Sequence, residues 1–262
     1  MVNHPTVGPL LRAVGDAAPD VVVISGDLTQ RARAAQFQEA REFLNSLPQP
    51  QLVVPGNHDV PYYNVLARFL SPLDNYRKYI SADVEPSYED AEVVIQGLNT
   101  ARSWTFKNGR INQRQIELVR DRFCGAPAEK LKILVTHHPL DLPRKFDETH
   151  LVGRAALAMP TLAACGVDLL LAGHYHIAHT GDTRTRYALE GFSALVVHAG
   201  TTISTRRRDE PNSFNLLRVT RREVIVECHI WSPAVNAFAL FLTERFQKGD
   251  QGWSRVPSEP VS

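Results

Sequence analysis

Four short polar segments of this 262-residue chain carry the side chains that hydrolytic metal sites use. The segments are Gly26-Asp27, Gly56-Asn57-His58-Asp59, Thr136-His137-His138-Pro139 and Leu171-Ala172-Gly173-His174-Tyr175-His176. Together they supply a carboxylate, an amide oxygen and several imidazoles, a donor set that suits divalent metal ions. Each segment alone is typical of an ordinary turn or helix cap, but all four follow apolar, strand-like runs. Their combination predicts a metal centre.

The residues of the first two segments suit different roles. Asp27 follows an apolar run at 21–24, so its carboxylate lies at a strand tip, where each oxygen can face one of two cations. Asn57 offers a neutral oxygen ligand, and His58 offers either a ligand or a proton donor. Asp59 is placed to accept a hydrogen bond from an imidazole and raise its basicity. The alternative for both aspartates is that each caps a following helix.

Two histidine pairs complete the donor set. Adjacent residues that leave a strand point in opposite directions, so we assign His137 as a ligand and place His138 behind it. In the last segment the His-x-His spacing puts His174 and His176 on one side, and Gly173 allows a close backbone approach. The alternative is a pair of partly exposed histidines at a strand end. The three donor segments that precede this one make the metal-ligand interpretation the favoured one.

Apolar runs and helical periods alternate along most of the chain and must position these segments. Short runs rich in β-branched residues predict strands at 21–25, 52–54, 92–98, 131–136, 168–172, 194–198, 214–220 and 223–230. Helical periods occupy 6–17, 34–46, 112–123 and 154–165. Strands that alternate with helices predict an α/β fold in which ligands gather beyond the strand ends. After residue 194 the pattern becomes strand-turn-strand, which predicts an antiparallel section.

Composition predicts one domain over residues 1–246 and a loose, Gly-, Pro- and Ser-rich tail over 247–262. The chain is 44% hydrophobic and 22% charged, which is enough apolar material for a full core. Its net charge of +1 gives no bulk attraction to nucleic acid or to a membrane. No stretch has the length and apolarity of a membrane span, and the first residues lack the pattern of a secretory signal.

The three cysteines, Cys124, Cys165 and Cys228, are scattered along the chain. Their odd number and the lack of a Cys-x-x-Cys pair predict three reduced, buried residues rather than a disulfide framework. Reduced cysteines fit a reducing compartment, so together with the missing signal they predict a cytoplasmic protein.

In this order the motifs resemble those of the calcineurin-like metallophosphoesterase superfamily, in particular its bacterial members that are similar to cyclic-nucleotide phosphodiesterases. The superfamily pattern is Asp-x-His, Gly-Asp, Gly-Asn-His-Asp/Glu, a His after a strand, and Gly-His-x-His. The resemblance implies a four-layer sandwich of two β-sheets flanked by helices and a centre of two divalent ions, Mn, Fe or Zn. It implies a proton-donating His58 at the scissile phosphate. The implied ligands are Asp27, shared by both ions, with Asn57, His137 and His174 for one ion and His176 for the other.

One motif of that pattern has no counterpart here. The sequence contains no Asp-x-His, and the first helical period begins near Thr6, with only residues 1–5 before it. We therefore expect that a first strand is missing, through truncation or a misassigned start. One metal site then has its full ligand set, while the other keeps only Asp27 and His176. Genuine loss of the motif is the alternative.

These features predict a metal-dependent hydrolase of phosphate mono- or diesters, acting on a small soluble ester such as a cyclic nucleotide. In the expected mechanism a metal-bridged hydroxide attacks phosphorus and His58 protonates the departing alkoxide. Asn57, His58 and Arg206 are the expected substrate contacts, although the Arg206-Arg207-Arg208 run also fits a solvated turn. Two alternatives stay open. One is a nuclease with the same centre, which the lack of a basic track disfavours, and the other is a scaffold that has lost its metals.

Overall fold

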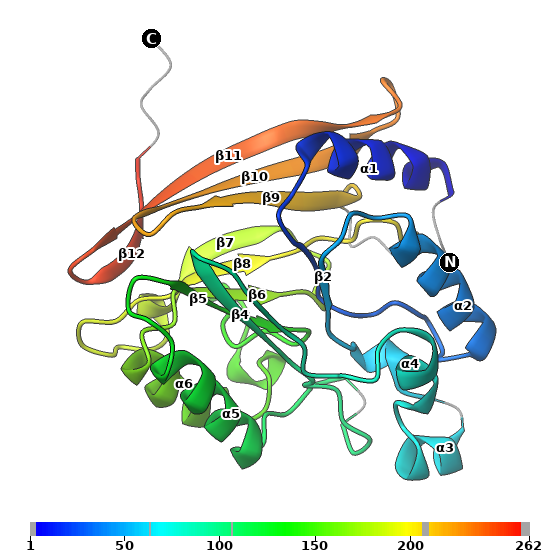
Figure 1. Ribbon diagram of the computed structural model, residues 1–262, viewed down its shortest axis with the longest axis horizontal. Coiled ribbons are helices and arrows are strands. Elements are labelled where there is room, and N and C mark those ends of the chain that lie inside the picture. The colour runs from blue at the N-terminus through cyan, green and yellow to red at the C-terminus, as the bar shows by residue number, and fades with distance from the viewer. Residues whose placement is uncertain (1–3, 63, 106, 206–209, 258–262) are drawn as a thin grey trace.

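Two stacked β-sheets with helices on both outer sides form the body of the molecule. The computed structural model describes residues 4–62, 64–105, 107–205 and 210–257. In Figure 1, α5 (Gln113–Cys124) and α6 (Ala155–Ala164) lie below the sheets, and α1 (His4–Ala17) lies above them. This layered α/β arrangement confirms the fold class predicted from the sequence.

The larger sheet has six strands in the order β3-β4-β5-β6-β8-β7. β4, β5, β6 and β8 run parallel, and β3 and β7 pair antiparallel at the two edges. Every residue of β4, β5 and β8 is buried, as parallel strands covered on both faces should be. The bounds are β3 (Ser87–Glu89), β4 (Val93–Leu98), β5 (Leu131–Thr136), β6 (Leu169–Ala172), β7 (His179–Asp182) and β8 (Leu195–His198).

Helices α5 and α6 cover one face of this sheet. α5 forms because its sequence has both a cap and an apolar stripe. The Asn112 side chain accepts the Gln115 backbone N–H, and the Gln115 side chain accepts the Asn112 N–H in return. Ile116, Val119 and Phe123 then follow at helical spacing and are buried in the core beneath the helix.

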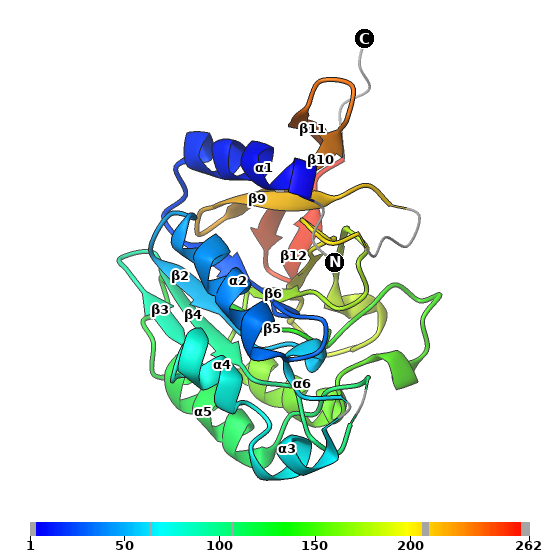
Figure 2. The same cartoon turned by 90° about the vertical axis from the view of Figure 1, so that its right-hand side faces the viewer.

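The smaller sheet covers the other face of the larger one. Its strands pair antiparallel in the order β12-β11-β10-β9. Their bounds are β9 (Ser213–Val219), β10 (Glu223–Ser232), β11 (Ala237–Gly249) and β12 (Gly252–Arg255). Val226 and Phe246 join the core that the two sheets enclose. Figures 1 and 2 show α1 lying across the outer face of this sheet, where Leu10 packs with Trp231 and Phe238.

A separate pair of parallel strands, β1 (Val22–Ile24) and β2 (Gln51–Val53), carries the first two donor segments. It packs with α2 (Ala34–Asn45) and α4 (Asp74–Tyr79) through a third core that includes Phe37 and Tyr76. The short helix α3 (Val65–Leu70) and the 3-10 turns η1 (Asn57–Asp59), η2 (Glu148–His150) and η3 (Thr183–Thr185) complete the described elements.

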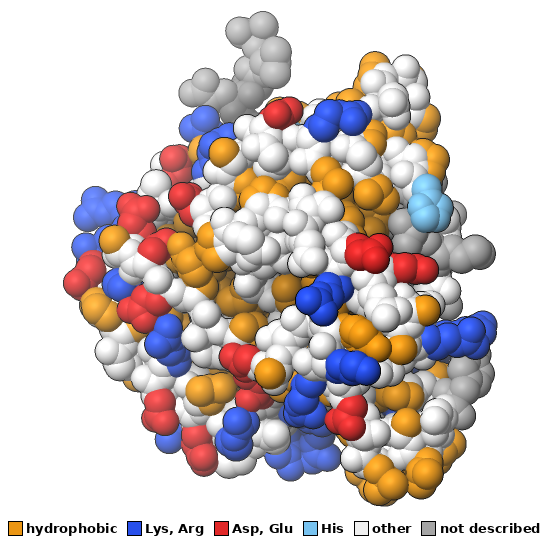
Figure 3. Space-filling view, turned by 45° about the vertical axis from the view of Figure 1, so that its right-hand side comes forward, with side chains coloured by type: hydrophobic (Ala, Val, Ile, Leu, Met, Phe, Trp, Pro, Cys, Tyr) orange, Lys and Arg blue, Asp and Glu red, His pale blue; other side chains and the backbone are white. Residues whose placement is uncertain are grey.

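Charges of both signs are mixed on the surface. On the face drawn in Figure 3, basic and acidic side chains are interspersed. The largest exposed apolar side chains include Leu66 and Leu70 of α3 and Leu240 and Phe241 of β11. None of the described helices has the length and apolarity needed to cross a bilayer.

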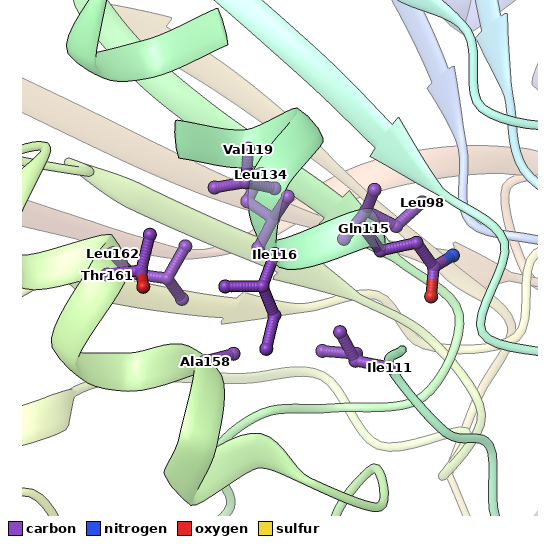
Figure 4. A pocket seen from close by; sticks show the side chains of 9 residues that line it. All are labelled: Leu98, Ile111, Gln115, Ile116, Val119, Leu134, Ala158, Thr161 and Leu162. Carbon is purple, nitrogen blue, oxygen red and sulfur yellow. The ribbon is translucent and has the colours of Figure 1, made fainter. Parts of the chain in front are cut away.

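A small void lies between α5, α6 and the larger sheet (Figure 4). Its volume is about 10 Å³, roughly the space of one water molecule. Apolar side chains such as Ile116, Leu134 and Leu162 point toward one another around it. The void is therefore a packing defect of the core and is too small for a ligand site.

The prediction of a loose tail over residues 247–262 is wrong for residues 247–255. Residues 247–249 end β11, and β12 pairs back onto them through a turn. Trp253 holds this segment against the body of the protein. Its side chain is buried between the sheets, and its indole N–H donates to the Asp168 carboxylate at 3.1 Å. The last five positions of the predicted tail lie outside the described residues.

The prediction of three reduced cysteines is also wrong. Cys124, the last residue of α5, and Cys165, which caps α6, form a disulfide, whereas Cys228 is free and buried. The two cysteines are 41 residues apart, and only the side-by-side packing of the two helices brings them together. The premise of unpaired cysteines therefore fails, and it no longer supports a reducing compartment.

Candidate metal centre

The four predicted donor segments meet beyond the ends of four strands. Asp27 follows β1, Asn57 begins the η1 turn after β2, His137 follows β5, and His174 follows β6. The parallel strands β5 and β6 are neighbours, so their carboxyl ends deliver both histidines to the same edge of the larger sheet. The packing of the β1–β2 pair brings the carboxylate and the amide to the same place.

His137 stands at the centre of this group. Its Nδ1 lies 2.6 Å from the Ser25 carbonyl oxygen, which can only accept, so Nδ1 carries the proton of the neutral ring. The ring lone pair is then on Nε2. That atom lies 3.1 Å from Asn57 Oδ1, 3.1 Å from His174 Nδ1 and 3.4 Å from Asp27 Oδ1. A ring held in this way through its other nitrogen is usual for a metal-ligating histidine.

The spacing of these donor atoms fits a divalent ion. Bonds of about 2.1 Å to one ion place two ligands about 3.0 Å apart at a right angle and about 3.4 Å apart at a tetrahedral angle. The separations of 3.1 Å and 3.4 Å from His137 Nε2 match that range. Without a cation, oxygen and nitrogen lone pairs would face one another there, which is unfavourable. The donor set and its geometry therefore fit a bound metal.

Asp27 is held in the left-handed backbone region, with a φ of 59°. Its Oδ1 accepts the His58 backbone N–H at 2.9 Å. A Cβ on Gly56 would lie only 2.2 Å from that oxygen, so the close approach of the two loops requires glycine. Burial alone would raise the pKa of Asp27, but the neighbouring His137 and His58 outweigh it and the pKa falls below its ordinary value. The carboxylate is ionised, as a metal ligand must be.

Asp59 does not accept the imidazole hydrogen bond predicted for it. Its carboxylate instead accepts three backbone N–H groups, from Leu28 at 3.2 Å, Thr29 at 2.9 Å and Gly56 at 2.9 Å. Burial, followed by the charge of Asp27, raises the pKa of Asp59 to about 6. Asp59 thus joins the loop after β1 to the loop after β2 and positions the donors that each loop carries.

His58 lies at the edge of the donor cluster, and hydrogen bonds to its ring and to its backbone carbonyl hold it in place. Its Nδ1 is 3.2 Å from the Gln30 carbonyl oxygen, so this nitrogen is the donor. The Thr29 hydroxyl donates to the His58 carbonyl oxygen at 2.9 Å. These contacts hold the imidazole at the cleft that lies over the donor cluster.

His174 and His176 both line that cleft, but not because a strand alternates. β6 ends at Ala172, and the two histidines have φ values of 73° and 57°, so each adopts a left-handed turn conformation. The His176 Nδ1 is hydrogen-bonded to the Thr201 hydroxyl. Gly173 permits the close approach expected of it, since a Cβ there would lie 2.7 Å from Ser25 Oγ.

His138 is buried behind His137, yet its ring also faces the cluster. Its ring centroid lies 4.7 Å from those of His137 and His174, and its Nδ1 is 2.8 Å from Thr100 Oγ1. One ring nitrogen from each of these three histidines lies within 4.8 Å of the other two. The alternation argument fails here because β5 ends at Thr136, and the following residues leave the extended conformation.

A cleft of about 540 Å³ opens over the donor cluster, within the usual range for small-molecule sites. Asp27, Asn57, His58, His174 and His176 line one part of it. The rest is a wall made of Lys107, Asn108, Thr149, His150 and Tyr175, and sequence reasoning missed all of these except His150. No period or motif marks the two loops that supply most of this wall. Arg206, the third expected substrate contact, lies outside the described residues.

Comparisons with known proteins agree on one family. A family model described as calcineurin-like phosphoesterase matches residues 2–178. The chain is 27% identical over 161 residues to the 3',5'-cyclic adenosine monophosphate phosphodiesterase CpdA of Escherichia coli strain K12, covering 60% of this chain and 54% of that protein. It is 24% identical over 183 residues to a probable cyclic nucleotide phosphodiesterase of Synechococcus, covering 68% and 66%. The chain thus spans about half the length of the Escherichia coli relative.

A shorter match and a structural match add to this result. Over 41 residues the chain is 49% identical to the glycerophosphodiester phosphodiesterase GpdQ of Enterobacter lignolyticus, which is 16% of this chain and 15% of that protein. A crystal structure of a dimetal phosphatase from Danio rerio superposes with a TM-score of 0.61 and 14% identity, over 85% of each chain. At that identity the likeness concerns the fold alone.

Proposed function

Because the chain belongs to the calcineurin-like phosphoesterase family, we propose that it hydrolyses small phosphate esters at a metal centre built on His137. The observation that carries the proposal is the convergence of Asn57, His174 and Asp27 donor atoms within 3.4 Å of His137 Nε2. In this proposal the four residues hold one divalent ion. Asp27 and His176 contribute to a second ion, for which the described residues offer fewer donors.

The chain's own residues have distinct tasks in this reaction. Bound Mn²⁺, Fe or Zn²⁺ would supply positive charge near the phosphoryl oxygens and lower the pKa of a water. His58, whose Nδ1–H donates to the Gln30 carbonyl, would hold a proton on Nε2 and give it to the departing alkoxide. The Ser25 carbonyl keeps the His137 lone pair directed at the cluster. Asp59 keeps the loops of Asp27 and Asn57 together.

The proposed substrate is a phosphodiester of small size. Relatives that carry the names of cyclic nucleotide and glycerophosphodiester phosphodiesterases support this class. A cleft of about 540 Å³ suits a compact ester. The net charge of +1 and the mixed charges of Figure 3 favour a small ester over a long nucleic-acid backbone.

The test is hydrolysis of bis-p-nitrophenyl phosphate by the metal-free protein and after addition of Mn²⁺. We expect activity only with metal. The Asp27→Ala variant should lose Mn²⁺ binding measured by calorimetry. His58→Ala should keep that binding and lose about 10²–10⁴-fold in kcat, the usual value of a positioned acid. His4→Ala, which removes an exposed imidazole on α1, is the matched control and should behave as wild type.

Two results would contradict the proposal. One is hydrolysis that persists without metal and in Asp27→Ala. The other is a protein that binds Mn²⁺ yet hydrolyses neither this ester nor a cyclic nucleotide nor a glycerophosphodiester. Calorimetry should also resolve one tight and one weak Mn²⁺ site, because only one ion has four donors among the residues named above.

A further inference from the structure

The cleft over the metal centre has a second wall that the proposed hydrolysis does not use. Lys107 and Asn108 come from the loop before residue 110, and Thr149 and His150 come from the η2 turn. These side chains differ in kind from the donor cluster, because they include a lysine, and the carboxylate beside them, Asp147, is bonded to His150 and Thr149. The wall therefore lies beside the metal ligands but has a different chemistry.

The wall is tied together and tied to the metal ligands. The Asn108 side-chain amide donates to the Thr149 carbonyl oxygen at 2.6 Å, which joins the two loops. The Tyr175 hydroxyl donates to the His150 carbonyl oxygen at 3.0 Å. Tyr175 stands between His174 and His176, so this bond fixes the wall relative to the predicted ligands. These bonds hold the main chain of the wall in place before a ligand binds, which lowers the cost of ordering it.

The His150 ring is oriented as well. Its Nδ1 donates to Asp147 Oδ1 at 2.8 Å, which leaves Nε2 for the cleft. The ring packs near Phe146 and Tyr175, with centroid distances of 5.6 Å and 5.8 Å. Asp147 also accepts from the Thr149 backbone N–H at 2.9 Å, so the carboxylate that holds the ring is itself fixed.

The charge of Lys107 points to the chemistry of the ligand. A lysine in the same cleft as divalent cations is repelled by them unless an anion lies between. Among the cleft residues only Asp27 is acidic, and it is directed at His137. The positive charge of Lys107 is therefore unmatched by the protein within the described part of the cleft, and a negatively charged group on the ligand would match it.

We propose that Lys107 and His150 form a second anion subsite, which binds an acidic group carried by the ester arm of the substrate. The inference rests on the proposed function, because the first phosphate must be held at the metal centre. It predicts that, among small phosphate esters, those whose alcohol bears a further carboxylate or phosphate bind most tightly. Lys107 supplies charge, and the imidazolium form of His150, whose Nδ1–H is held by Asp147, supplies a directed hydrogen bond from its Nε2–H.

The experiment compares matched pairs of competitive ligands on the Mn²⁺-loaded protein. One series is ethyl, propyl and butyl phosphate. The other has the same chain lengths and ends in a carboxylate: phosphoglycolate, 3-phosphonooxypropionate and 4-phosphonooxybutyrate. Inhibition constants are measured against bis-p-nitrophenyl phosphate, and binding is measured directly by calorimetry. We expect at least one acid to bind about 10-fold more tightly than its alkyl partner, the usual value of one charge-assisted hydrogen bond.

Substitutions then show which residues cause the preference for the acid. Lys107→Ala and His150→Ala should remove the preference for the acid and change the affinity for the alkyl phosphate less than about 2-fold. Lys107→Arg should retain the preference, because it keeps the charge. Lys78→Ala, at an exposed lysine of α4, should leave both affinities unchanged. Both test residues are partly or fully exposed, so their loss should not disturb the fold.

The outcomes separate this inference from the proposed function. If alkyl phosphates do not bind the Mn²⁺-loaded protein at all, the proposed function itself fails. If they bind but no acid of any length binds more tightly, the second subsite is refuted. It is also refuted if Lys107→Ala and His150→Ala both keep the preference.

Discussion

The buried histidine at the end of β8 should make the fold sensitive to mild acid. His198 is 2% exposed, and within the described residues its Nε2 has no hydrogen-bond partner. Burial, and to a smaller extent the neighbouring His179, lowers the pKa of His198 from 6.5 to about 3. The perturbation we consider is a change of pH from 7.5 to 5.5, which protonates this ring in the unfolded chain only.

The sign and size follow from proton linkage. Between pH 6.5 and 3 the unfolded state binds the proton and the folded state does not, so the free energy of unfolding falls as the pH falls. At pH 5.5 about ten of eleven unfolded molecules are protonated, which stabilises the unfolded state by RT ln 11, about 1.4 kcal/mol. At pH 4.5 the same expression gives about 2.7 kcal/mol. Above about pH 7.5 the contribution of His198 is almost fully retained.

Urea unfolding of the wild type and of His198→Gln at both pH values provides the assay. Metal-free protein is used, so that release of metal from the other histidines adds nothing. His138 and His179, whose pKa values are also lowered mainly by burial, are present in both proteins and largely cancel. The wild type should lose about 1.4 kcal/mol more than the variant between pH 7.5 and 5.5. Equal losses in the two proteins would show that His198 does not cause the acid sensitivity.

Two further perturbations have outcomes that follow from contacts described above. Gly56→Ala places a methyl group 2.2 Å from Asp27 Oδ1, so calorimetry should show Mn²⁺ binding weakened by about 10-fold or more. Gly15→Ala, whose added methyl meets nothing within 4 Å, is the control, and equal Mn²⁺ affinity in both variants would contradict the role given to Asp27. Reduction of the Cys124–Cys165 disulfide, which closes a loop of 41 residues, should lower the free energy of unfolding by about 4 kcal/mol in the chain-entropy account. An unchanged urea midpoint after complete reduction would contradict it.

The sequence predicted best where one strong local signal decides the structure. The apolar runs before Asp27 and His137 form strands at nearly the predicted residues, because β-branched apolar side chains favour extended backbone. The donor segments follow directly, so their convergence follows from the strand ends. The helix over residues 113–124 was predictable for the same reason, since its cap and its apolar stripe agree.

The rest depends on contacts between distant residues. The partners of Asp59 are backbone amides, which leave no trace in residue types. β11 has four successive exposed apolar residues, 239–242, so neither strand alternation nor a polar loop marks it. The disulfide arises only from the packing of α5 against α6. The wall with Lys107 and His150 lies on loops, where the sequence has no period to read.

The Asp59 carboxylate has a consequence for how the centre can open. Because it receives amides from both Leu28–Thr29 and Gly56, neither loop can swing outward without giving up hydrogen bonds that the other loop shares. Opening is thus an all-or-none local event on this side of the cleft. The metal centre therefore gains or loses the donors Asp27 and Asn57 together. A half-assembled centre with only one of them in place is a high-energy state.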